Sequence, residues 1–468
     1  MEMTASYRVK IRHYNSILKP TVAIYRAAVD FFVGVCRDEW EHLSQIANAN
    51  YRMRAVERLT HRTRNNPSPK YCFDDARLPK KILSLPGMRE ASAVDKKPAV
   101  FYKFPSYLRR AAIHTALGMV ASWKSRLSVW EAEDPQSRQR RPSLPRATAA
   151  VMPVLYHGNC YERTGSYTAR IKVFVRNTWD WLEIGLRHTD VNYIERHFAD
   201  IKASSPTLLR KGKEWYLSFA YTQKMELEDP HPDECRILAV DLGINHACTC
   251  VCMTKEGTVL GREFLSLSRE EDSLMHAIGR IKKAQRHGAR RMPRLWAKAR
   301  GVTAGIASGT AAFIMGKAIA YNVHVIVFEH LDVRGRKRGS RKQRLHHWRA
   351  AEVQRIVTDR AHRKGMRISR VCAWGTSALA YDGSGRVERG KSAGLPSYST
   401  CRFPTGKVYD CDLNASYNIG ARYFVREITK SVPETVRQRL GAEVPGACKR
   451  STCTLSTLWD VNACLSGR

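Results

Sequence analysis

The sequence lacks the pattern by which most structural zinc sites are recognised. It contains 13 cysteines but no C-x-x-C pair, so zinc is not expected as a cofactor. An odd number of cysteines also argues against a complete disulfide framework. Cys248, Cys250 and Cys252 alternate within one apolar stretch. This pattern is typical of free thiols that pack as small apolar side chains in a reducing compartment.

Long apolar runs are missing as well. No segment reaches the about 18 consecutive apolar residues of a membrane span, and the N-terminus has no apolar signal core. We therefore expect no membrane partner. The expected location of the protein is the cytoplasm, in association with the nucleoid of a prokaryotic cell.

Acidic residues are scarce compared with basic ones. The chain of 468 residues has 79 Lys and Arg against 43 Asp and Glu, a formal net charge of +36 at pH 7. This excess extends along the whole chain, and its self-repulsion would destabilise the folded state unless a polyanion is the usual partner. The composition therefore predicts a nucleic-acid-binding protein, and the length suggests about two to four domains.

Carboxylates recur at the ends of apolar runs in the second half of the chain. Ile237–Asp241 is a short apolar run that ends on an acid, and His324–Glu329 repeats the pattern. Asp410–Asp412 directly precedes a helix-like segment. In a mixed α/β sheet, acids that follow strands can gather at one edge. The sequence therefore predicts that three separated acids converge.

The order of the expected elements predicts a multidomain α+β protein. Residues 1–19 contain one alternating strand, which could pair back into the later strand region, and residues 20–135 contain two blocks of helical spacing. Residues 141–232 contain short alternating runs at 150–156, 167–176, 179–185 and 215–222, the pattern of a small antiparallel barrel or sandwich. From residue 233, three consecutive strands followed by alternating helices and strands predict a mixed α/β sheet. The strands are expected at 237–241, 247–253, 258–264, 323–328 and 367–372. The helices are expected as one long region at 268–321, at about 346–364 and after Asp412.

Three segments resemble the split RuvC motifs of the TnpB proteins and the compact type V CRISPR effectors. They are Val240–Asn245 (VDLGIN), Phe328–Leu331 (FEHL) and Asp410–Ile419 (DCDLNASYNI). Phe104–Arg110 also resembles a recurrent sequence of the recognition lobe of that family. The resemblance implies an RNA-guided DNA endonuclease with an RNase H-like (RuvC) catalytic core.

The resemblance also implies a domain order. The first half of the chain would contain a first wedge strand (1–19), a helical recognition domain (20–135) and a wedge β-barrel (141–232). The second half would contain the first two RuvC motifs (233–371), a target-nucleic-acid-binding insertion (372–408), the third RuvC motif (409–430) and a C-terminal tail (431–468).

The resemblance assigns catalysis and metal binding to Asp241, Glu329 and Asp412. Asp412 is preferred to Asp410 because it immediately precedes the Leu-Asn-Ala run, as the metal ligand of the family does. Three carboxylates without His or Cys form a hard oxygen donor set that suits Mg²⁺ or Mn²⁺. Two such ions would activate the attacking water and stabilise the leaving oxygen.

The chain departs from the family between the second and third motifs, where many members carry a zinc ribbon. Gly375–Ser377 matches the start of that ribbon, but Ala380–Gly385 and Thr405–Gly406 occupy the positions of its two knuckles. Three cysteines remain nearby, namely Cys372, Cys401 and Cys411. We expect this insertion to fold as a loop or ribbon without zinc.

Basic side chains are candidates for contacts with a nucleic-acid backbone. Two lie at the start of a predicted helix, where a solvated helix face is the alternative interpretation, and seven crowd the loop after the second acid. They are Arg109 and Arg110, and Arg334, Arg336, Lys337, Arg338, Arg341, Lys342 and Arg344.

The leading hypothesis is an enzyme that binds a guide RNA and cleaves matching double-stranded DNA beside a short flanking motif, with a single RuvC active site. Two alternatives stay open. One is an unguided RuvC-like resolvase or transposase, and the other is an RNA-guided DNA binder that acts by occupancy. The sequence also leaves open a transposon-encoded or CRISPR-associated origin, and a monomer or a homodimer on one RNA.

Overall fold

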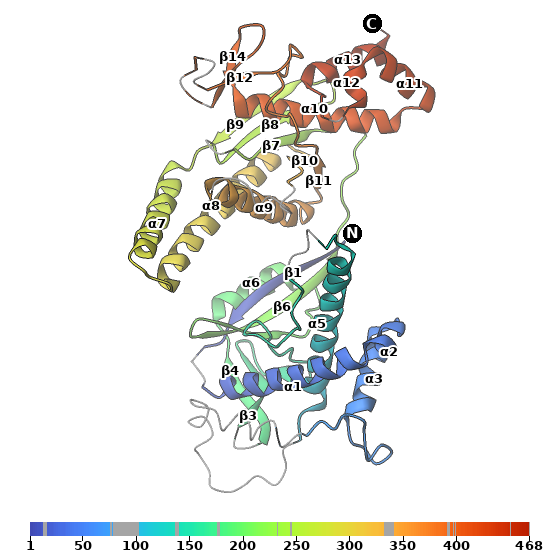
Figure 1. The fold of residues 1–468 in the computed structure, drawn as a ribbon, viewed down its shortest axis with the longest axis vertical. Helices are drawn as coiled ribbons and strands as arrows, with labels where there is room; N and C mark the ends of the chain where they lie inside the picture. Colours follow the sequence, from blue (N-terminus) through green and yellow to red (C-terminus); the bar gives the residue numbers. More distant parts are fainter. Residues whose placement is uncertain are drawn as a thin grey trace. The chain divides into compact units, whose positions relative to one another are not determined.

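The computed structural model describes most of the chain. The described residues are 1–12, 16–74, 77, 103–135, 140–175, 178–231, 233–243, 246–331, 341–390, 394–395, 397, 399–449 and 451–467, without the side chains of 341–348 and 448. The chain divides into two compact units. Glu2–Gln223 forms the N-terminal unit, and Lys224–Arg468 forms the C-terminal unit, to which Met1 is joined by backbone hydrogen bonds with Met225. Figure 1 shows both units.

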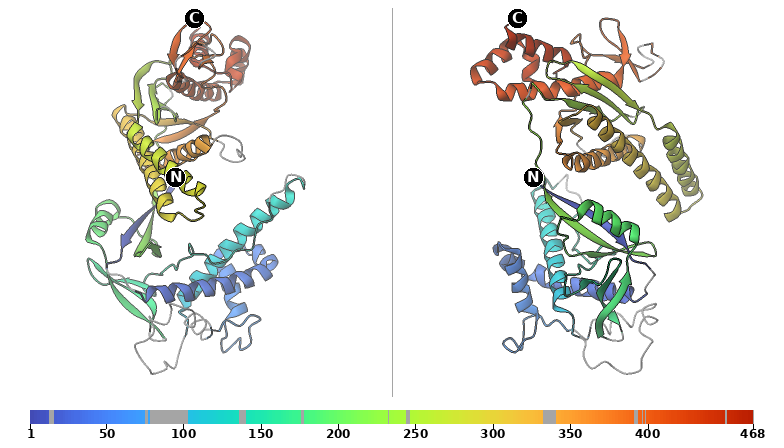
Figure 2. Two further views of the ribbon diagram at one scale, coloured as in Figure 1. Left: turned by 60° about the vertical axis from the view of Figure 1, so that its left-hand side comes forward. Right: turned by 180° about the vertical axis from the view of Figure 1, so that it is seen from behind.

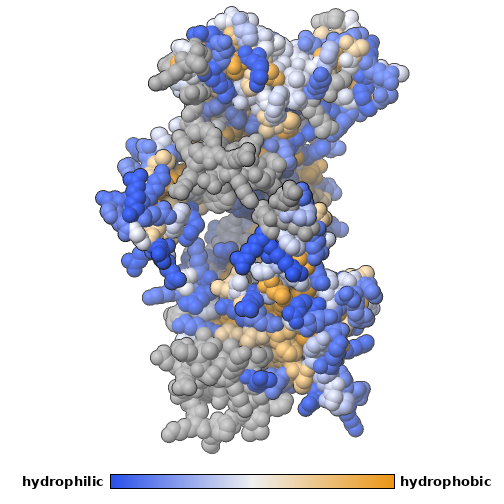
Figure 3. Space-filling view, viewed as in Figure 1, coloured by the Kyte–Doolittle hydropathy of each residue, from blue (hydrophilic) through white to orange (hydrophobic). Residues whose placement is uncertain are grey.

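Helices form the first half of the N-terminal unit. They are α1 (Leu18–Asp38), α2 (Trp40–Gln45), α3 (Ala49–Thr60) and α5 (Ser106–Ala132). α1 packs against α5 and both contribute fully buried side chains, among them Tyr25, Phe32 and Leu108. The two helical blocks expected from the apolar spacing are therefore confirmed. Figure 3 shows apolar surface over α1 and α5 on a face that is otherwise mainly hydrophilic.

Two small sheets complete the N-terminal unit. The first contains β2 (Tyr161–Arg163), β3 (Thr168–Val175) and β4 (Thr178–Gly185), and the second has the order β1 (Glu2–Lys10), β6 (Glu214–Lys224), β5 (Thr207–Lys211). As expected, the first strand of the chain pairs back into this region, and a bridge between Ile11 and Leu186 connects the two sheets.

Two expectations for the N-terminal unit are wrong. The run 150–156 forms no strand and makes only an isolated bridge from Val154 to Thr207, next to Pro153, which has no N–H to donate. The helix α6 (His188–Phe198) was not expected from the sequence. Only Asp190 and Val191 are fully buried in it.

The C-terminal unit is built on one mixed sheet. Its strands are β7 (Ile237–Asp241), β8 (Cys248–Met253), β9 (Val259–Leu265), β10 (Val325–Glu329) and β11 (Arg367–Val371), in the order β11-β10-β7-β8-β9. β10 runs parallel to both β11 and β7, whereas β8 is antiparallel to β7 and β9. The five strands expected from the sequence are confirmed to within about two residues at each end.

Helices cover both faces of this sheet (Figure 2). α8 (Pro293–Ala320) and α9 (Arg341–His362) pack on one face against Leu238 and Val240, while α10 (Cys411–Ser431) packs on the other face against Ile237 and Ala239. Because successive strand residues point to opposite faces, a strand buried on both sides must be apolar throughout. This explains the uninterrupted apolar run that precedes Asp241.

Other helices extend these layers. The single helical region expected at 268–321 is two helices, α7 (Ser268–Arg286) and α8, which begins with Pro293. The tail folds as α11 (Glu434–Glu443), α12 (Pro445–Cys448) and α13 (Leu455–Ser466), of which α13 packs on α10.

The insertion between the second and third motifs contains a small ribbon, as expected. Its strands are β12 (Glu388–Arg389), β13 (Thr400–Arg402) and β14 (Val408–Asp410), in the order β12-β13-β14. Ala380, Cys401, Phe403 and Cys411 form its buried apolar core. Two of the three remaining cysteines therefore serve as packing residues here.

One helix in the described part of the chain, α8, is long and apolar enough to pass a membrane-span test based on length and composition. The core helix of a soluble domain passes the same test. Ile306, Ala311 and Ile314 of α8 are fully buried within the unit.

Candidate active site

Two of the predicted acids lie at the ends of neighbouring parallel strands. Val240 of β7 is paired with Phe328 of β10, so Asp241 and Glu329 occupy the next position of the same register. The four residues that precede each acid are buried, and the acids themselves are partly exposed. The sheet therefore presents both carboxylates together at its edge.

The third acid comes from the start of α10. Asp410 is the N-cap of this helix and accepts a hydrogen bond from the Leu413 N–H at 2.8 Å, which commits its side chain to the helix end. Asp412 instead faces the turn after Asp241. A Cβ atom at Gly243 would lie 2.9 Å from Asp412 Oδ2, so the glycine allows the carboxylate to lie close to this turn. Asp412 therefore lies beside the turn that follows Asp241, and its charge, like the smaller effect of Asp410, raises the pKa of Asp241.

Two polar side chains hold the acids, and the sequence reasoning assigned a role to neither. The Thr376 hydroxyl donates a hydrogen bond to Glu329 Oε1. His246 Nδ1 lies 3.2 Å from Asp412 Oδ2. His246 follows Asp241 by five residues, and Thr376 belongs to the Gly375–Ser377 segment. The only feature of the sequence that could have indicated these two supporting residues is that each is a polar residue close to a motif.

The electrostatics of this edge favour a bound cation. Burial and the charges of Glu329 and Asp412 raise the pKa of Asp241 well above its usual range. Burial also raises the pKa of Glu329 and of Asp412, against the opposing effects of the Thr376 and His246 hydrogen bonds. Three carboxylates with raised pKa values repel one another, and a divalent cation between them would remove that repulsion.

The donor set fits Mg²⁺ or Mn²⁺, because all three side chains supply carboxylate oxygens. In the part of the chain that the structure describes, no three His, Cys, Asp or Glu side chains already meet at metal-binding distance. Glu329 and Asp412 are turned toward Thr376 and His246 instead. Metal binding would therefore require these two carboxylates to exchange partners.

The two asparagines of the third motif hold the loop that carries Thr376. Asn414 accepts a hydrogen bond from Tyr381 N and donates one to Leu379 O, both at 2.8 Å. Asn418, one turn later, donates to Thr376 O and to Leu379 O, both at 2.9 Å. The D-x-N-A-x-x-N spacing thus places one acid and two loop anchors on a single helix.

A buried arginine ties the tail to the same loop. The Arg422 guanidinium donates to the carbonyl oxygens of Cys372, Trp374, Ser451 and Cys453 at distances between 2.6 and 3.1 Å. Burial lowers its pKa, and its charge lowers the pKa of Glu329. The C-terminal tail is therefore joined to the loop beside Glu329.

The two arginines that were predicted to contact a nucleic-acid backbone from the start of a helix lie in different environments. Arg109 is only 3% exposed, and its Nη2 atom lies 3.4 Å from Glu57 Oε1. This interior position corrects the expectation that Arg109 contacts phosphate from a helix surface. Arg110 has a partly exposed side chain 3.3 Å from the same Glu57 oxygen.

The structure does not test the predicted nucleic-acid contacts of the seven basic residues after the second acid. Four of them lie outside the described residues, namely Arg334, Arg336, Lys337 and Arg338. The other three belong to α9, where the side chains are not described, namely Arg341, Lys342 and Arg344.

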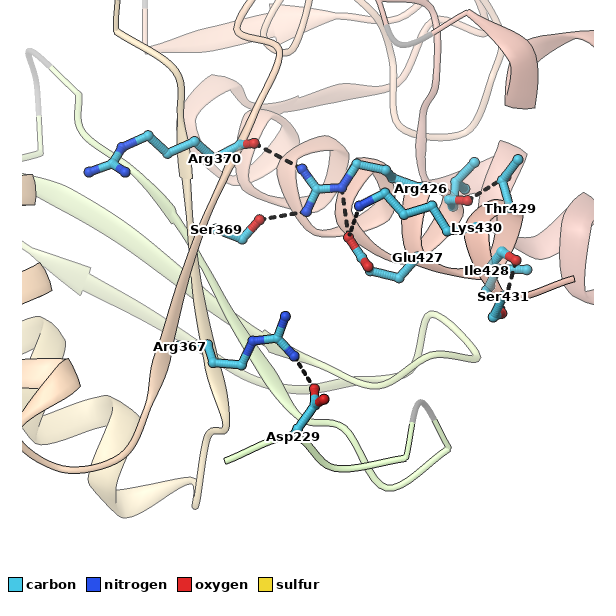
Figure 4. A network of polar contacts seen from close by, with 11 residues as sticks. Asp229, Arg367, Ser369, Arg370, Arg426, Glu427, Ile428, Thr429, Lys430 and Ser431 are labelled. Carbon is cyan, nitrogen blue, oxygen red and sulfur yellow. Dashed lines mark hydrogen bonds and ion pairs between the residues drawn. The ribbon is translucent and has the colours of Figure 1, made fainter. Parts of the chain in front are cut away.

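A basic cavity that the sequence did not reveal lies beside β11 and α10. It has a volume of about 750 Å³ and basic side chains in its lining, namely His330, Arg370, Arg422, Arg426, Lys430 and Arg437. Arg426 donates to Arg370 O and Ser369 Oγ and also pairs with Glu427, which pairs with Lys430 in turn (Figure 4). Its six basic side chains come from three segments far apart in the sequence.

Comparison with known proteins gives a partial match. The profile of the Aq_aa04 family matches residues 5–175, less than half of the chain. No curated protein matches the chain.

Solved structures resemble the chain at low identity. Cas12f1, in a cryo-EM complex with sgRNA and target DNA, is 13% identical with a TM-score of 0.33, and the match covers 89% of this chain and 98% of that one. C2c1 of Alicyclobacillus acidoterrestris, in a crystal structure with single-guide RNA, is 10% identical with a TM-score of 0.46, covering 90% and 88%. CasPhi-2 (Cas12j), bound to crRNA, is 9% identical with a TM-score of 0.36, covering 89% and 97%. Similarity at this level assigns no family, so the function must be inferred from the site.

Proposed function

We propose that this protein is an RNA-guided DNA endonuclease that cleaves DNA with one RuvC-type, metal-dependent active site. The proposal is carried by the neighbouring strand ends that bear Asp241 and Glu329, with Asp412 beside the turn after Asp241, in a chain of formal charge +36. A cluster of partly buried acids costs folding stability, and a strongly basic chain does not need one to bind nucleic acid. Phosphodiester hydrolysis is the chemistry that uses both features.

In this proposal, each residue of the candidate site has its own role. Asp241 and Glu329 present oxygen atoms from rigid strand ends, and Asp412 presents its oxygens from the first turn of α10, where the helix dipole favours a negative charge. Thr376 and His246 orient Glu329 and Asp412. Two divalent cations held by these three acids would polarise the scissile phosphate and activate water for attack.

Other parts of the chain would bind the nucleic acids. The basic cavity beside α10 and the basic segment after Glu329 are the candidates for contacts with the backbones of the guide RNA and the target DNA. The helices and small sheets of the N-terminal unit would serve as a recognition lobe and a wedge, and would read the short flanking motif. A zinc ion is not part of this proposal.

A pair of neighbouring substitutions tests the active site. Asp412→Ala should reduce cleavage of matched DNA by more than about 100-fold, because even outer partners of metal ligands cost about 10- to 100-fold when lost. Asp410→Asn is the matched control, since asparagine caps a helix as well as aspartate does and cleavage should persist. Full cleavage by Asp412→Ala would contradict the proposal.

RNA that remains bound through a high-salt purification tests the guide. Expression with the native flanking DNA should yield one discrete, structured RNA that ends in a variable segment, and this RNA should direct cleavage. Heterogeneous cellular RNA together with cleavage of branched DNA would favour the unguided resolvase or transposase. Full-strength target binding without turnover would favour an RNA-guided binder.

A further inference from the structure

The basic cavity beside β11 and α10 has the size of a small-molecule site. Its volume of about 750 Å³ lies within the range of about 300–1,000 Å³ that is typical of such sites. Its lining contains the six basic side chains named above and, among the described residues, no Asp or Glu. This lining favours an anion as the ligand.

The cavity carries more positive charge than its ion pairs neutralise. Five of its six basic side chains are Arg or Lys. In the described part of the chain, these five have two carboxylates as ion-pair partners, Glu427 and Glu434. Both carboxylates lie outside the lining of the cavity. An anion inside the cavity would therefore meet a net positive charge.

Neutral oxygen atoms hold two of the guanidinium groups in place. Arg422 donates to four backbone carbonyl oxygens. Arg426 donates to Arg370 O at 3.0 Å and to Ser369 Oγ at 2.6 Å (Figure 4). These contacts fix the direction of each side chain without removing its charge. Donors that are already fixed lose less conformational entropy when a ligand binds.

The rest of the lining is mainly apolar. Val371 at the end of β11 and Val425 of α10 contribute one part, and Ala447 and Cys453 of the C-terminal tail contribute another. Small-molecule sites commonly combine such apolar walls with a few polar groups that orient the ligand. A bare inorganic ion would leave these walls without a contact. The lining therefore favours an anion that carries an organic group.

A phosphate monoester matches the excess of positive charge better than a phosphodiester does. At pH 7 a monoester carries a charge of about −1.5 to −2 and offers three oxygen atoms, whereas each phosphodiester of a backbone carries one negative charge. Guanidinium groups bind phosphate through two parallel hydrogen bonds. A monoester also ends the molecule, so it enters a cavity with its charged group first, whereas a backbone continues on both sides of each phosphate.

We propose that this cavity is a binding site for a phosphate monoester with a small organic group, such as a nucleoside monophosphate. The phosphate binds the Arg and Lys side chains, and the organic group lies against the apolar walls. A free nucleotide and the phosphorylated end of a strand offer the same chemistry. This inference goes beyond the proposed function, which needs from the cavity only contacts with a continuous backbone.

Equilibrium dialysis tests the site separately from catalysis. The full-length protein, purified with its bound RNA, is dialysed against ³²P-labelled deoxyadenosine 5′-monophosphate. EDTA removes divalent cations, so that the three acids do not bind the phosphate through a metal ion. Binding of the labelled nucleotide should be saturable and should persist in KCl concentrations that suppress nonspecific binding.

Two pairs of variants locate the binding. Arg370→Met and Lys430→Met each remove one charge from the lining and should weaken binding by about 10- to 150-fold, the contribution of a hydrogen bond to a charged group. Arg363→Met and Lys317→Met remove the same charges elsewhere in the unit and should bind like the wild type. None of these four side chains is buried, so all variants should unfold close to the wild-type temperature.

Unlabelled competitors identify the ligand. Displacement by a 5′-phosphorylated oligodeoxynucleotide would assign the site to a strand end, and displacement by the mononucleotide alone would assign it to a free nucleotide. Either result supports the inference. Equal displacement by the same oligodeoxynucleotide without its terminal phosphate would show that a continuous backbone occupies the cavity, and would overturn the inference. Equal displacement by deoxyadenosine would overturn it as well.

The outcomes separate this inference from the proposed function. Unchanged binding in both Arg370→Met and Lys430→Met, or equal losses in the two control variants, would overturn the site even if the protein cuts DNA. Nucleotide binding by a protein that cleaves no matched DNA in Mg²⁺ would support the site and contradict the nuclease. Cleavage without any nucleotide binding would contradict the site alone.

Discussion

Among the residues that the structure describes, each unit contains one buried arginine, and the two are supported very differently. In the C-terminal unit, Arg422 donates to four backbone carbonyl oxygens and joins the tail to the loop beside Glu329. In the N-terminal unit, Arg109 has one carboxylate partner, Glu57, at 3.4 Å, and its Nε and Nη1 atoms have no partner among the described residues. A buried charge stabilises a protein only when its hydrogen bonds are complete. We therefore expect Arg422 to be structurally required and Arg109 to be replaceable.

The largest effect should come from Arg422→Met. The substitution leaves four carbonyl groups without their donor, and loss of one side of a buried polar network costs about 3–5 kcal/mol of the free energy of unfolding. Chemical denaturation of the full chain measures this. Arg426→Met, one turn along α10 and partly exposed, is the control and should lose less. Equal losses of unfolding free energy in Arg422→Met and Arg426→Met would contradict the special structural role of Arg422.

Mg²⁺ should stabilise the C-terminal unit. A cation that binds only the folded protein adds about 2.7 kcal/mol to the free energy of unfolding when its concentration is 100 times the dissociation constant. Thermal unfolding with and without Mg²⁺ should show this gain, and Asp241→Asn should abolish it. A gain of the same size in Asp241→Asn would place the cation elsewhere.

Loss of the helix cap should cost less. Asp410→Ala removes the acceptor for Leu413 N–H at the start of α10, which is worth about 0.5–2 kcal/mol. Asp410→Asn should restore the stability, because asparagine supplies the same acceptor. A large loss of cleavage in both variants at full stability would instead show that Asp410 belongs to the metal site.

The metal-free protein should lose stability as the pH rises through the acidic range. Because the folded protein raises the pKa of Asp241, it binds more protons than the unfolded chain between the usual aspartate pKa of about 4 and the raised value. The free energy of unfolding therefore falls as the pH increases through this window. Asp241→Asn should flatten that dependence and raise the unfolding temperature at neutral pH. If the pH dependence of the free energy of unfolding were the same in Asp241→Asn, the folded protein would not raise the pKa of Asp241.

The smallest effect is expected for Arg109→Met. A flexible apolar side chain fills the buried site without unpaired N–H groups, and Glu57 keeps its contact with Arg110. The free energy of unfolding should change by less than about 1 kcal/mol. Arg110→Met in the same background tests whether Glu57 then lacks a partner. A loss of several kcal/mol in Arg109→Met alone would mean that Arg109 is as well supported as Arg422.

Much of the C-terminal unit could be predicted because local pattern and tertiary environment agree there. Strands buried on both faces must be apolar, so the runs before Asp241 and Glu329 are visible in the sequence. In the N-terminal unit the pattern is weaker. The sequence at 150–156 alternates like a strand, but around Pro153 it forms a single bridge.

The candidate site also has parts that could be predicted from the sequence and parts that could not. Its acids could be predicted because each follows a recognisable strand or precedes a recognisable helix. Its supporting residues could not, because His246, Thr376 and Arg422 act through contacts between segments far apart in the chain. The failure at Arg109 has the same origin, since a pair of arginines at a helix start does not reveal which of them faces the core.

The sequence by itself determined the charge of the protein, the five strands of the mixed sheet and the three acids at its edge. These follow from composition and from apolar periods that are local to each segment. Only the tertiary structure decided that His246 contacts Asp412, that Thr376 holds Glu329, and that Arg422 secures the tail beside Glu329. Each of these depends on which surfaces meet when distant segments pack, and no period within a single segment encodes that.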